Sequence, residues 1–372
     1  MMGFTPWARD CRTVAARPGP SPDSLYEHIG EQLAALMPLF NVEAARETIW
    51  RAYALLCWQS LDMPCGRRPI GGSRLNADGT PFQFSLALGA PDPTLQFLAE
   101  TAPPHFVGGQ RIATARQCIC DLAVLFGAQA SLTLASPWLD ALAPDDDPEL
   151  LSDEAGGIWV GAAFGAGGIA RLKAYVNVKW GCASSRWSRL DAFAGHLGVA
   201  PDWRRARERV PDLQPLGASL VIGADAPPAG RIYLSGYGKP WDEYAALGGH
   251  FGGPAFGRHL RQYGQTLLKD DCAYPTRSAV ASFGLQRGAI ADVKVELCGH
   301  CAFDSDVQAK ARCIQWLRQI GLDPAFYVQT VDMLCAGPLC TTETRLHAYL
   351  GVGSGHDWPS STFYFNPAEA RS

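Results

Sequence analysis

The chain has 372 residues, 47% of them apolar, and its 32 basic and 36 acidic side chains give a net charge of −4. This composition supports a large hydrophobic core and excludes disorder and, because no basic run is present, nucleic-acid binding. No window of about 18 apolar residues and no secretion signal occurs, so we expect a cytoplasmic protein that does not enter a membrane and whose 12 cysteines are reduced.

A repeated unit runs along the chain: an alternating strand, a short turn, a second alternating strand and a helical stretch. The unit occurs five times, and turn residues rich in glycine, proline and aspartate separate the two strands of each pair. The predicted pairs are Phe82–Leu88 with Thr94–Glu100, Ile158–Phe164 with Ala170–Trp180, Ser219–Ala224 with Arg231–Tyr237, Ala279–Leu285 with Ala291–Leu297, and Arg345–Gly353 with Ser361–Asn366.

Helical stretches fill the gaps between these hairpins. The clearest apolar stripes are Ile29, Leu33 and Leu36 ahead of Pro38, and Val307, Ala311, Ile314 and Leu317 ahead of Gly321. Five hairpins give ten antiparallel strands, and a sheet of that size tends to close on itself, which removes its exposed edges. We therefore expect one domain over residues 1–372, an α+β barrel of ten antiparallel strands in αββα blocks, with residues 1–20 as a loosely ordered extension.

Side-chain alternation predicts which face of each strand meets water. Polar Lys173, Tyr175 and Asn177 alternate with apolar Leu172 and Ala174, and the same division recurs in the later hairpins. With amphipathic helices available to cover the apolar faces from outside, the polar faces are expected to line a central cavity. This is the reverse of a lipocalin-like barrel, whose interior is apolar.

Cations and tyrosines share the predicted cavity wall. The cations come from the second strands of three successive hairpins, and the tyrosines from these strands and the last hairpin: Lys173, Arg231 and Lys294, with Tyr175, Tyr233, Tyr349 and Tyr364. Converging cations suit a polyanion such as diphosphate, and tyrosine rings can shield a carbocation. Any one of these residues could equally be a solvated strand charge or a half-buried tyrosine. Their recurrence favours a site that ionises an allylic diphosphate.

Several segments carry a family resemblance. The stretch from Ser73 to Ser85 is similar to the pattern Ser-x-Leu-Thr-x-x-Gly-x-Pro-x-Glu-Phe-Ser, Lys173-Ala174-Tyr175 to Lys-x-Tyr, and Arg231-Ile232-Tyr233 to the end of Arg-x-Lys-x-Tyr. The closing strands through Tyr349 and Tyr364 extend the match over most of the chain. In these segments the sequence resembles the aromatic prenyltransferases of the ABBA, or prenyltransferase-barrel, fold, specifically the bacterial dimethylallyltryptophan synthase-like group.

The resemblance implies transfer of a dimethylallyl group from dimethylallyl diphosphate to an electron-rich aromatic ring, typically an indole, with no cofactor and no obligatory metal. The partners it implies are therefore two small molecules, the prenyl diphosphate and the aromatic acceptor. It assigns the three cations to the diphosphate and the four tyrosines to shielding of the allyl cation.

Four positions depart from the family pattern, and one of them is Ala229, which stands where the family has an extra arginine. Gln83 stands at the glutamate that accepts the indole N–H, Gln96 near the first diphosphate arginine, and Glu296 where a tyrosine is common. Because a glutamine amide donates as well as accepts, we expect an acceptor that presents a carbonyl or hydroxyl, such as an oxygenated indole or carbazole. Gln83, Glu296 and His347, the last also placed on the cavity wall, are the candidate acceptor contacts.

Other readings of the sequence stay open or are weaker. A non-catalytic barrel that binds an anionic metabolite, or a prenyltransferase for peptide side chains, fits the same wall. Cys298-Gly299-His300-Cys301 has the spacing of a disulfide-exchange site, but the βαβ units of a thioredoxin-like fold are missing. The acidic run around Asp145 and Asp146, bracketed by prolines, indicates a solvated loop rather than a magnesium motif.

Overall fold

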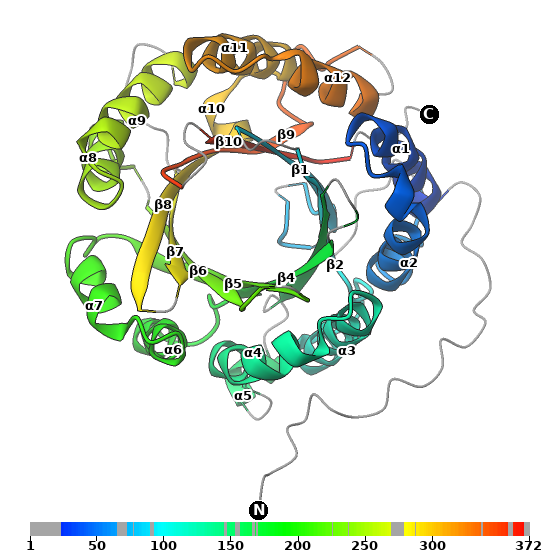
Figure 1. Cartoon of the computed structure of the whole chain (residues 1–372), viewed down its shortest axis with the longest axis vertical. Helices are drawn as coiled ribbons and strands as arrows, with labels where there is room; N and C mark the ends of the chain where they lie inside the picture. Colours follow the sequence, from blue (N-terminus) through cyan, green and yellow to red (C-terminus); the bar gives the residue numbers. More distant parts are fainter. Residues whose placement is uncertain are drawn as a thin grey trace, which may run out of the picture.

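The computed structural model describes residues 24–64, 73–76, 78–89, 93–144, 147–152, 157–165, 168, 170–224, 226–236, 238–268, 279–286, 288–335, 338–355 and 360–367. The extension expected at residues 1–20 lies outside these ranges. Ten strands form one closed antiparallel barrel (Figure 1). They are β1 Phe82–Leu88, β2 Leu95–Glu100, β3 Ile158–Phe164, β4 Ala170–Asn177, β5 Gln214–Gly223, β6 Ala229–Ser235, β7 Val280–Gln286, β8 Ala289–Cys298, β9 His347–Gly353 and β10 Ser360–Phe365.

Strands adjacent in the chain are adjacent in the barrel, and β1 closes it against β10 from Phe84 with Phe365 to Leu88 with Ser361. The predicted ten-stranded barrel is confirmed. Most strand boundaries differ from the prediction by one or two residues, and the largest differences are that β4 ends at Asn177 and β5 begins at Gln214. A register shift between Pro215 and Gly217 lets the earlier residues of β5 continue to pair with β6.

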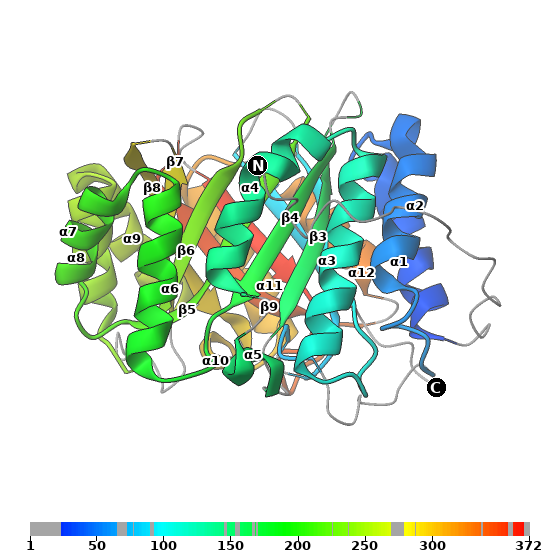
Figure 2. The ribbon, with the colours of Figure 1, turned by 90° about the horizontal axis from the view of Figure 1, so that it is seen from below.

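The helices form a ring around the outside of the barrel (Figures 1 and 2). They are α1 Leu25–Leu39, α2 Arg46–Cys57, α3 Gly108–Leu125, α4 Gln129–Leu142, α5 Pro148–Ser152, α6 Ala183–His196, α7 Ala200–Glu208, α8 Trp241–Phe251, α9 Pro254–Leu267, α10 Gly299–Ala302, α11 Asp306–Gln319 and α12 Ala325–Leu334, with a 3₁₀ turn η2 at Glu43–Ala45. Ser24 and Ser305 cap α1 and α11, since each hydroxyl accepts a backbone N–H of the first turn.

The hydrophobic core lies between the outer face of the barrel and this ring. Phe82 and Phe97 of the barrel pack edge-on against Tyr53 of α2, with ring centroids 6.1 and 6.2 Å apart. The stripe expected in α11 was partly wrong, since Val307 is 45% exposed and Cys313 and Trp316 are buried instead. The predicted stripe and the buried stripe both have helical spacing, so periodicity alone could not show which of them faces the core.

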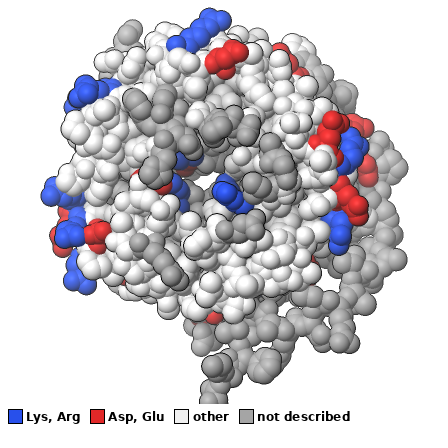
Figure 3. Space-filling model, in the orientation of Figure 1, with Lys and Arg blue, Asp and Glu red and all other residues white. Residues whose placement is uncertain are grey.

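The apolar outer face leaves the polar face of each strand for the interior. Viewed down the barrel, the molecule has a hollow at its centre with basic side chains at the wall (Figure 3). No helix in the described part of the chain is long and apolar enough to cross a membrane.

Candidate active site

The even-numbered strands place the functional side chains at matching depths. Each strand is antiparallel to its neighbours, so β4, β6, β8 and β10 all run in the same direction. A residue two positions after another therefore lies on the same face and closer to the same end of the barrel. In this way Tyr175 follows Lys173 on β4, and Tyr233 follows Arg231 on β6.

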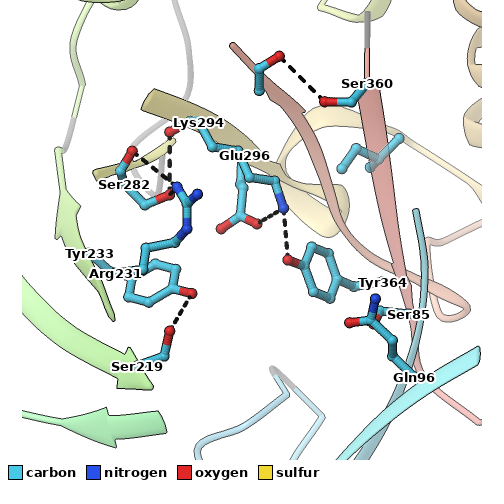
Figure 4. A network of polar contacts seen from close by, with 12 residues as sticks. Ser85, Gln96, Ser219, Arg231, Tyr233, Ser282, Lys294, Glu296, Ser360 and Tyr364 are labelled. Atoms are coloured by element: carbon cyan, nitrogen blue, oxygen red, sulfur yellow. Dashed lines mark hydrogen bonds and ion pairs between the residues drawn. The ribbon is translucent and has the colours of Figure 1, made fainter. Parts of the chain in front are cut away.

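These side chains share one cavity of about 330 Å³ inside the barrel. Of the residues predicted from sequence, the ones that line it are Gln96, Lys173, Tyr175, Arg231, Tyr233, Lys294 and Tyr364. The structure thus brings together the three predicted cations with three of the four predicted tyrosines. Several of them point toward a common space in Figure 4.

Two of the three cations form ion pairs with carboxylates: Asp292, which lines the cavity, and Glu296, which is not among its lining residues. Arg231 contacts Asp292, and its guanidinium also donates to the hydroxyl of Ser282 at 3.1 Å. The ammonium of Lys294 lies 2.7 Å from Oε1 of Glu296 (Figure 4). Asp292 was not among the predicted site residues, although its alternation with Val293 could have identified it.

Glycines make room for both carboxylates. Gly284 is the cross-strand partner of Asp292, and Gly351 is that of Glu296. A Cβ on Gly284 would lie 2.0 Å from Oδ2 of Asp292, and one on Gly351 would lie 2.9 Å from Cγ of Glu296. Each ion pair therefore requires the glycine opposite its carboxylate, a pairing that the sequence does not reveal before the register is known.

Lys173 has a different environment. Its ammonium donates to Oε1 of Gln96 on β2, which places Gln96 beside the cations as the sequence predicted. Burial, together with the nearby charges of Lys294 and Arg231, lowers the pKa of Lys173 to about 7. An anion in the cavity would offset both effects and favour the charged ammonium.

Tyr175, Tyr233 and Tyr364 line the cavity next to the cations, whereas Tyr349 is not among its lining residues. The rings of Tyr175 and Tyr233 have centroids 6.0 Å apart, and those of Tyr349 and Tyr364 meet edge-on at 6.3 Å. The Tyr233 hydroxyl lies 3.1 Å from that of Ser219, a contact that the sequence analysis missed. The hydroxyl of Tyr364 accepts from the ammonium of Lys294 at 2.8 Å, which links the aromatic and cationic parts of the wall.

Gln83 lies on the inward face of β1 and is held by a neighbouring loop. Its amide nitrogen donates to Oδ1 of Asn76 at 2.8 Å, while Nδ2 of Asn76 donates to the carbonyls of Thr80 and Phe82. These bonds fix the orientation of both amides. One of the two amide hydrogens of Gln83 is therefore used within the protein, and Gln83 is not among the residues that line the cavity.

His347 does not lie on the cavity wall, and its predicted placement there was wrong. Its Nδ1 is 2.9 Å from Oδ1 of Asp306 in α11, and its Nε2 is 2.7 Å from the hydroxyl of Tyr327 in α12. The register between β9 and β10 shifts between Tyr364, which pairs with Tyr349, and Phe365, which pairs with His347, and this shift turns His347 to the outer face. This irregularity reverses the face that strict alternation predicts.

Glu100, at the end of β2, is a buried carboxylate that the sequence analysis did not select. It accepts from Nε1 of Trp159 at 2.9 Å and from the hydroxyl of Ser73 at 3.5 Å. Arg111 of α3 lies 3.9 Å away. Burial raises the pKa of Glu100 to about 7, although these partners oppose the shift. Its contacts tie the loop before β1 to the barrel wall.

The cysteine motif forms a compact group away from the cations. Cys298, His300 and Cys301 each offer a ligand atom within 4.8 Å of the others, so in the described part of the chain they could hold a metal ion. None of the three lines the cavity that contains Lys173. The acidic residues Asp145 and Asp146 lie outside the described residues.

Solved structures share this architecture. The 6-dimethylallyltryptophan synthase from Micromonospora olivasterospora, in complex with DMASPP and Trp, aligns with a TM-score of 0.82 at 18% identity, over 92% of this chain and 97% of that chain. The 5-dimethylallyl tryptophan synthase from Streptomyces coelicolor, in complex with the same two ligands, aligns with a TM-score of 0.79 at 19% identity, over 95% and 98%. The prenyltransferase PriB, in a ternary complex with L-tryptophan and dimethylallyl thiolodiphosphate, gives 0.77 at 20%, over 92% and 96%.

The chain has the ABBA fold of these aromatic prenyltransferases. The likeness extends over nearly the whole of each chain, so the predicted prenyltransferase barrel is confirmed as the fold. A comparison with protein-family models finds no match, and neither does one with curated protein sequences.

Proposed function

We propose that the protein is an aromatic prenyltransferase that moves a dimethylallyl group from dimethylallyl diphosphate to a nitrogen heteroaromatic of the indole or carbazole type. The observation that carries the proposal is the convergence of Lys173, Arg231 and Lys294 with a set of tyrosines in one cavity of this barrel. Structures of this fold hold a prenyl diphosphate analogue together with tryptophan, which supports the same pair of substrate classes here.

The diphosphate is bound by the cationic part of the wall. Lys173, Arg231 and Lys294 supply charge and hydrogen bonds, and Gln96 orients Lys173. As the carbon–oxygen bond of the prenyl diphosphate breaks, its electron pair leaves with the diphosphate, whose growing charge these groups stabilise. In this proposal three side-chain cations do what a metal ion would otherwise do.

The allyl cation and the acceptor occupy the aromatic part of the wall. Tyr175, Tyr233, Tyr349 and Tyr364 shield the cation with their ring faces. The fixed amide of Gln83 presents its oxygen to the N–H of the acceptor. Ring attack on the cation forms the new carbon–carbon bond, and loss of a ring proton restores aromaticity.

The test is incubation with dimethylallyl diphosphate and a panel of indoles, tryptophan, carbazoles and peptides, read by mass spectrometry. We expect a mass gain of one dimethylallyl group on a heteroaromatic acceptor, with unchanged turnover after exhaustive chelation. Lys173→Ala and Arg231→Ala should each lose roughly 2–4 kcal/mol of transition-state stabilisation while remaining folded. Wild-type rates in both variants at subsaturating prenyl diphosphate would contradict the diphosphate assignment.

A non-catalytic barrel that binds an anionic metabolite is the second candidate, because Asp292 and Glu296 offset two of the three cations. Under this alternative, dimethylallyl thiolodiphosphate binds but no member of the panel is prenylated. Modification of the peptides alone would point to side-chain prenylation.

A further inference from the structure

On β8, a carboxylate takes the place that tyrosines take on the equivalent strands. Lys173 and Arg231 are each followed two residues later by a tyrosine, whereas Lys294 is followed by Glu296. Because β4, β6 and β8 run in the same direction, Glu296 lies on the same side of its cation as Tyr175 and Tyr233 do of theirs. Glu296 is not itself among the residues that line the cavity, but its carboxylate lies directly beside Lys294, which does line it, at the level assigned to the allyl cation and acceptor.

The carboxylate of Glu296 is buried and charged. The residue is 7% exposed, and its Oε1 lies 2.7 Å from the ammonium of Lys294. Burial opposes ionisation, but the charge and hydrogen bond of Lys294, with a hydrogen bond from Tyr364, hold the pKa of Glu296 below its usual value. A diphosphate that binds Lys294 competes for this ammonium and leaves the carboxylate more basic.

The proposed reaction needs a group that removes a proton from the acceptor ring. Gln83 cannot serve, because a neutral amide does not take up a proton at ordinary pH. Asp292 precedes Lys294 by two residues, so it lies on the other side of the cations from Glu296, and it holds Arg231. Glu100 is engaged by Trp159 and Ser73.

We propose that Glu296 is the base that accepts the ring proton of the aromatic acceptor; this rests on the proposed function. The electron pair of the carbon–oxygen bond leaves with the diphosphate, and a ring electron pair forms the carbon–carbon bond. The pair of the ring carbon–hydrogen bond then returns to the ring, and the proton passes to a carboxylate oxygen of Glu296. The proton is afterwards released to the departing diphosphate or to water.

The test compares Glu296→Gln with the wild type on ring-deuterated indole, tryptophan or carbazole, whichever the wild type prenylates. We expect transfer by the variant to fall about 10²-fold or more, the range of general-base loss. Release of dimethylallyl alcohol from dimethylallyl diphosphate should stay within about threefold, since ionisation does not need the base. The kinetic isotope effect on transfer should rise from near unity to above about 2 as proton removal becomes rate-limiting.

Asp292→Asn is the matched control, because it makes the same carboxylate-to-amide change on the same strand and releases the other paired cation. It should alter binding of dimethylallyl thiolodiphosphate but leave the isotope effect near unity. Glu296→Asp, which keeps the carboxylate, should recover part of the transfer rate and serves as the second variant if Glu296→Gln does not fold.

Three outcomes would overturn the assignment of Glu296. They are wild-type transfer by Glu296→Gln, an isotope effect that stays near unity in it, or parallel loss of alcohol release and transfer, which would place Glu296 in ionisation instead. Where Glu296→Gln does not fold, wild-type transfer by Glu296→Asp with an isotope effect near unity would overturn it. Failure of the wild type to prenylate any acceptor would instead contradict the proposed function.

Discussion

The side-chain amide of Gln83 donates to Oδ1 of Asn76 at 2.8 Å, and the Asn76 amide nitrogen in turn donates to two backbone carbonyls. This series of hydrogen bonds fixes the orientation of the Gln83 amide, with its nitrogen toward Asn76. One of the two amide hydrogens of Gln83 is thereby used within the protein, so donation to an oxygenated acceptor would have to come from the second hydrogen.

Gln83→Glu should therefore destabilise the protein. A carboxylate oxygen would face Oδ1 of Asn76, and relief by rotation of the asparagine would leave backbone carbonyls without donors, at a cost of about 1–3 kcal/mol. Urea unfolding at pH 7 measures the effect, and Gln214→Glu, at an exposed position of β5, provides the same charge change without such a partner. Equal stability of the two variants would mean that Asn76 does not orient Gln83.

The depressed pKa of Lys173 predicts proton uptake when the diphosphate binds. Burial and the charges of Lys294 and Arg231 lower its pKa to about 7, so most free protein carries a neutral Lys173 at pH 8. A bound diphosphate favours the ammonium, and linkage then requires uptake of nearly one proton at pH 8. Calorimetric titration with dimethylallyl thiolodiphosphate in two buffers of different ionisation enthalpy counts these protons.

Lys173→Arg is the control for this measurement, because a guanidinium stays protonated at pH 8. We expect binding to that variant to take up almost no proton. Equal uptake by the wild type and the variant would assign the titration to another group.

The contact between His347 and Asp306 predicts that a substitution of His347 lowers the stability of the protein but not its affinity for the acceptor. Asp306 accepts backbone N–H groups of Arg345 and Leu346 as well as Nδ1 of His347, and both members of the pair are about 2% exposed. His347→Ala should lower the free energy of unfolding by about 2–4 kcal/mol, because it removes a buried charged hydrogen bond and leaves space.

His347→Asn should restore part of that stability, since its amide can donate in place of Nδ1. Thermal unfolding and the KM for the acceptor, measured on both variants, separate the two roles. A raised KM at unchanged stability would return His347 to the acceptor site.

Glu100 predicts a pH dependence of folding. Its pKa in the folded protein, about 7, is raised above the value in an unfolded chain. The stability associated with the neutral form is present at low pH and is lost as the pH rises through 7, by about 1–3 kcal/mol. Glu100→Gln, which can still accept from Trp159, should therefore be more stable than the wild type at pH 9 and nearly equal at pH 5.

The matched control is Glu31→Gln in α1, which also removes one negative charge but at an exposed position. Chemical unfolding across this pH range should show no comparable gain in the free energy of unfolding of Glu31→Gln. If Glu100→Gln were less stable than the wild type at every pH, its ion pair with Arg111 would outweigh the cost of burying the charge.

Local pattern along the chain was enough to predict the barrel and most of its cavity wall. Alternation in Ala170–Asn177 identified Lys173 and Tyr175 as inward residues, and the same rule identified Arg231 and Lys294, because a strand side chain can point only to one of two faces. Five hairpins make a sheet of ten strands, and closure of that sheet removes its exposed edges. Closure also brings these inward residues together, whatever the details of packing.

The contacts that these residues make follow from the three-dimensional arrangement of the strands. One extra residue in β9 turned His347 outward, a shift that local periodicity cannot report. The partners of Arg231 and Lys294 depend on which glycine lies across each strand, Gly284 or Gly351, and on the register between strands distant in the chain. Hydrogen bonds and ion pairs form over a few ångströms, so they follow from three-dimensional register and not from spacing along the sequence.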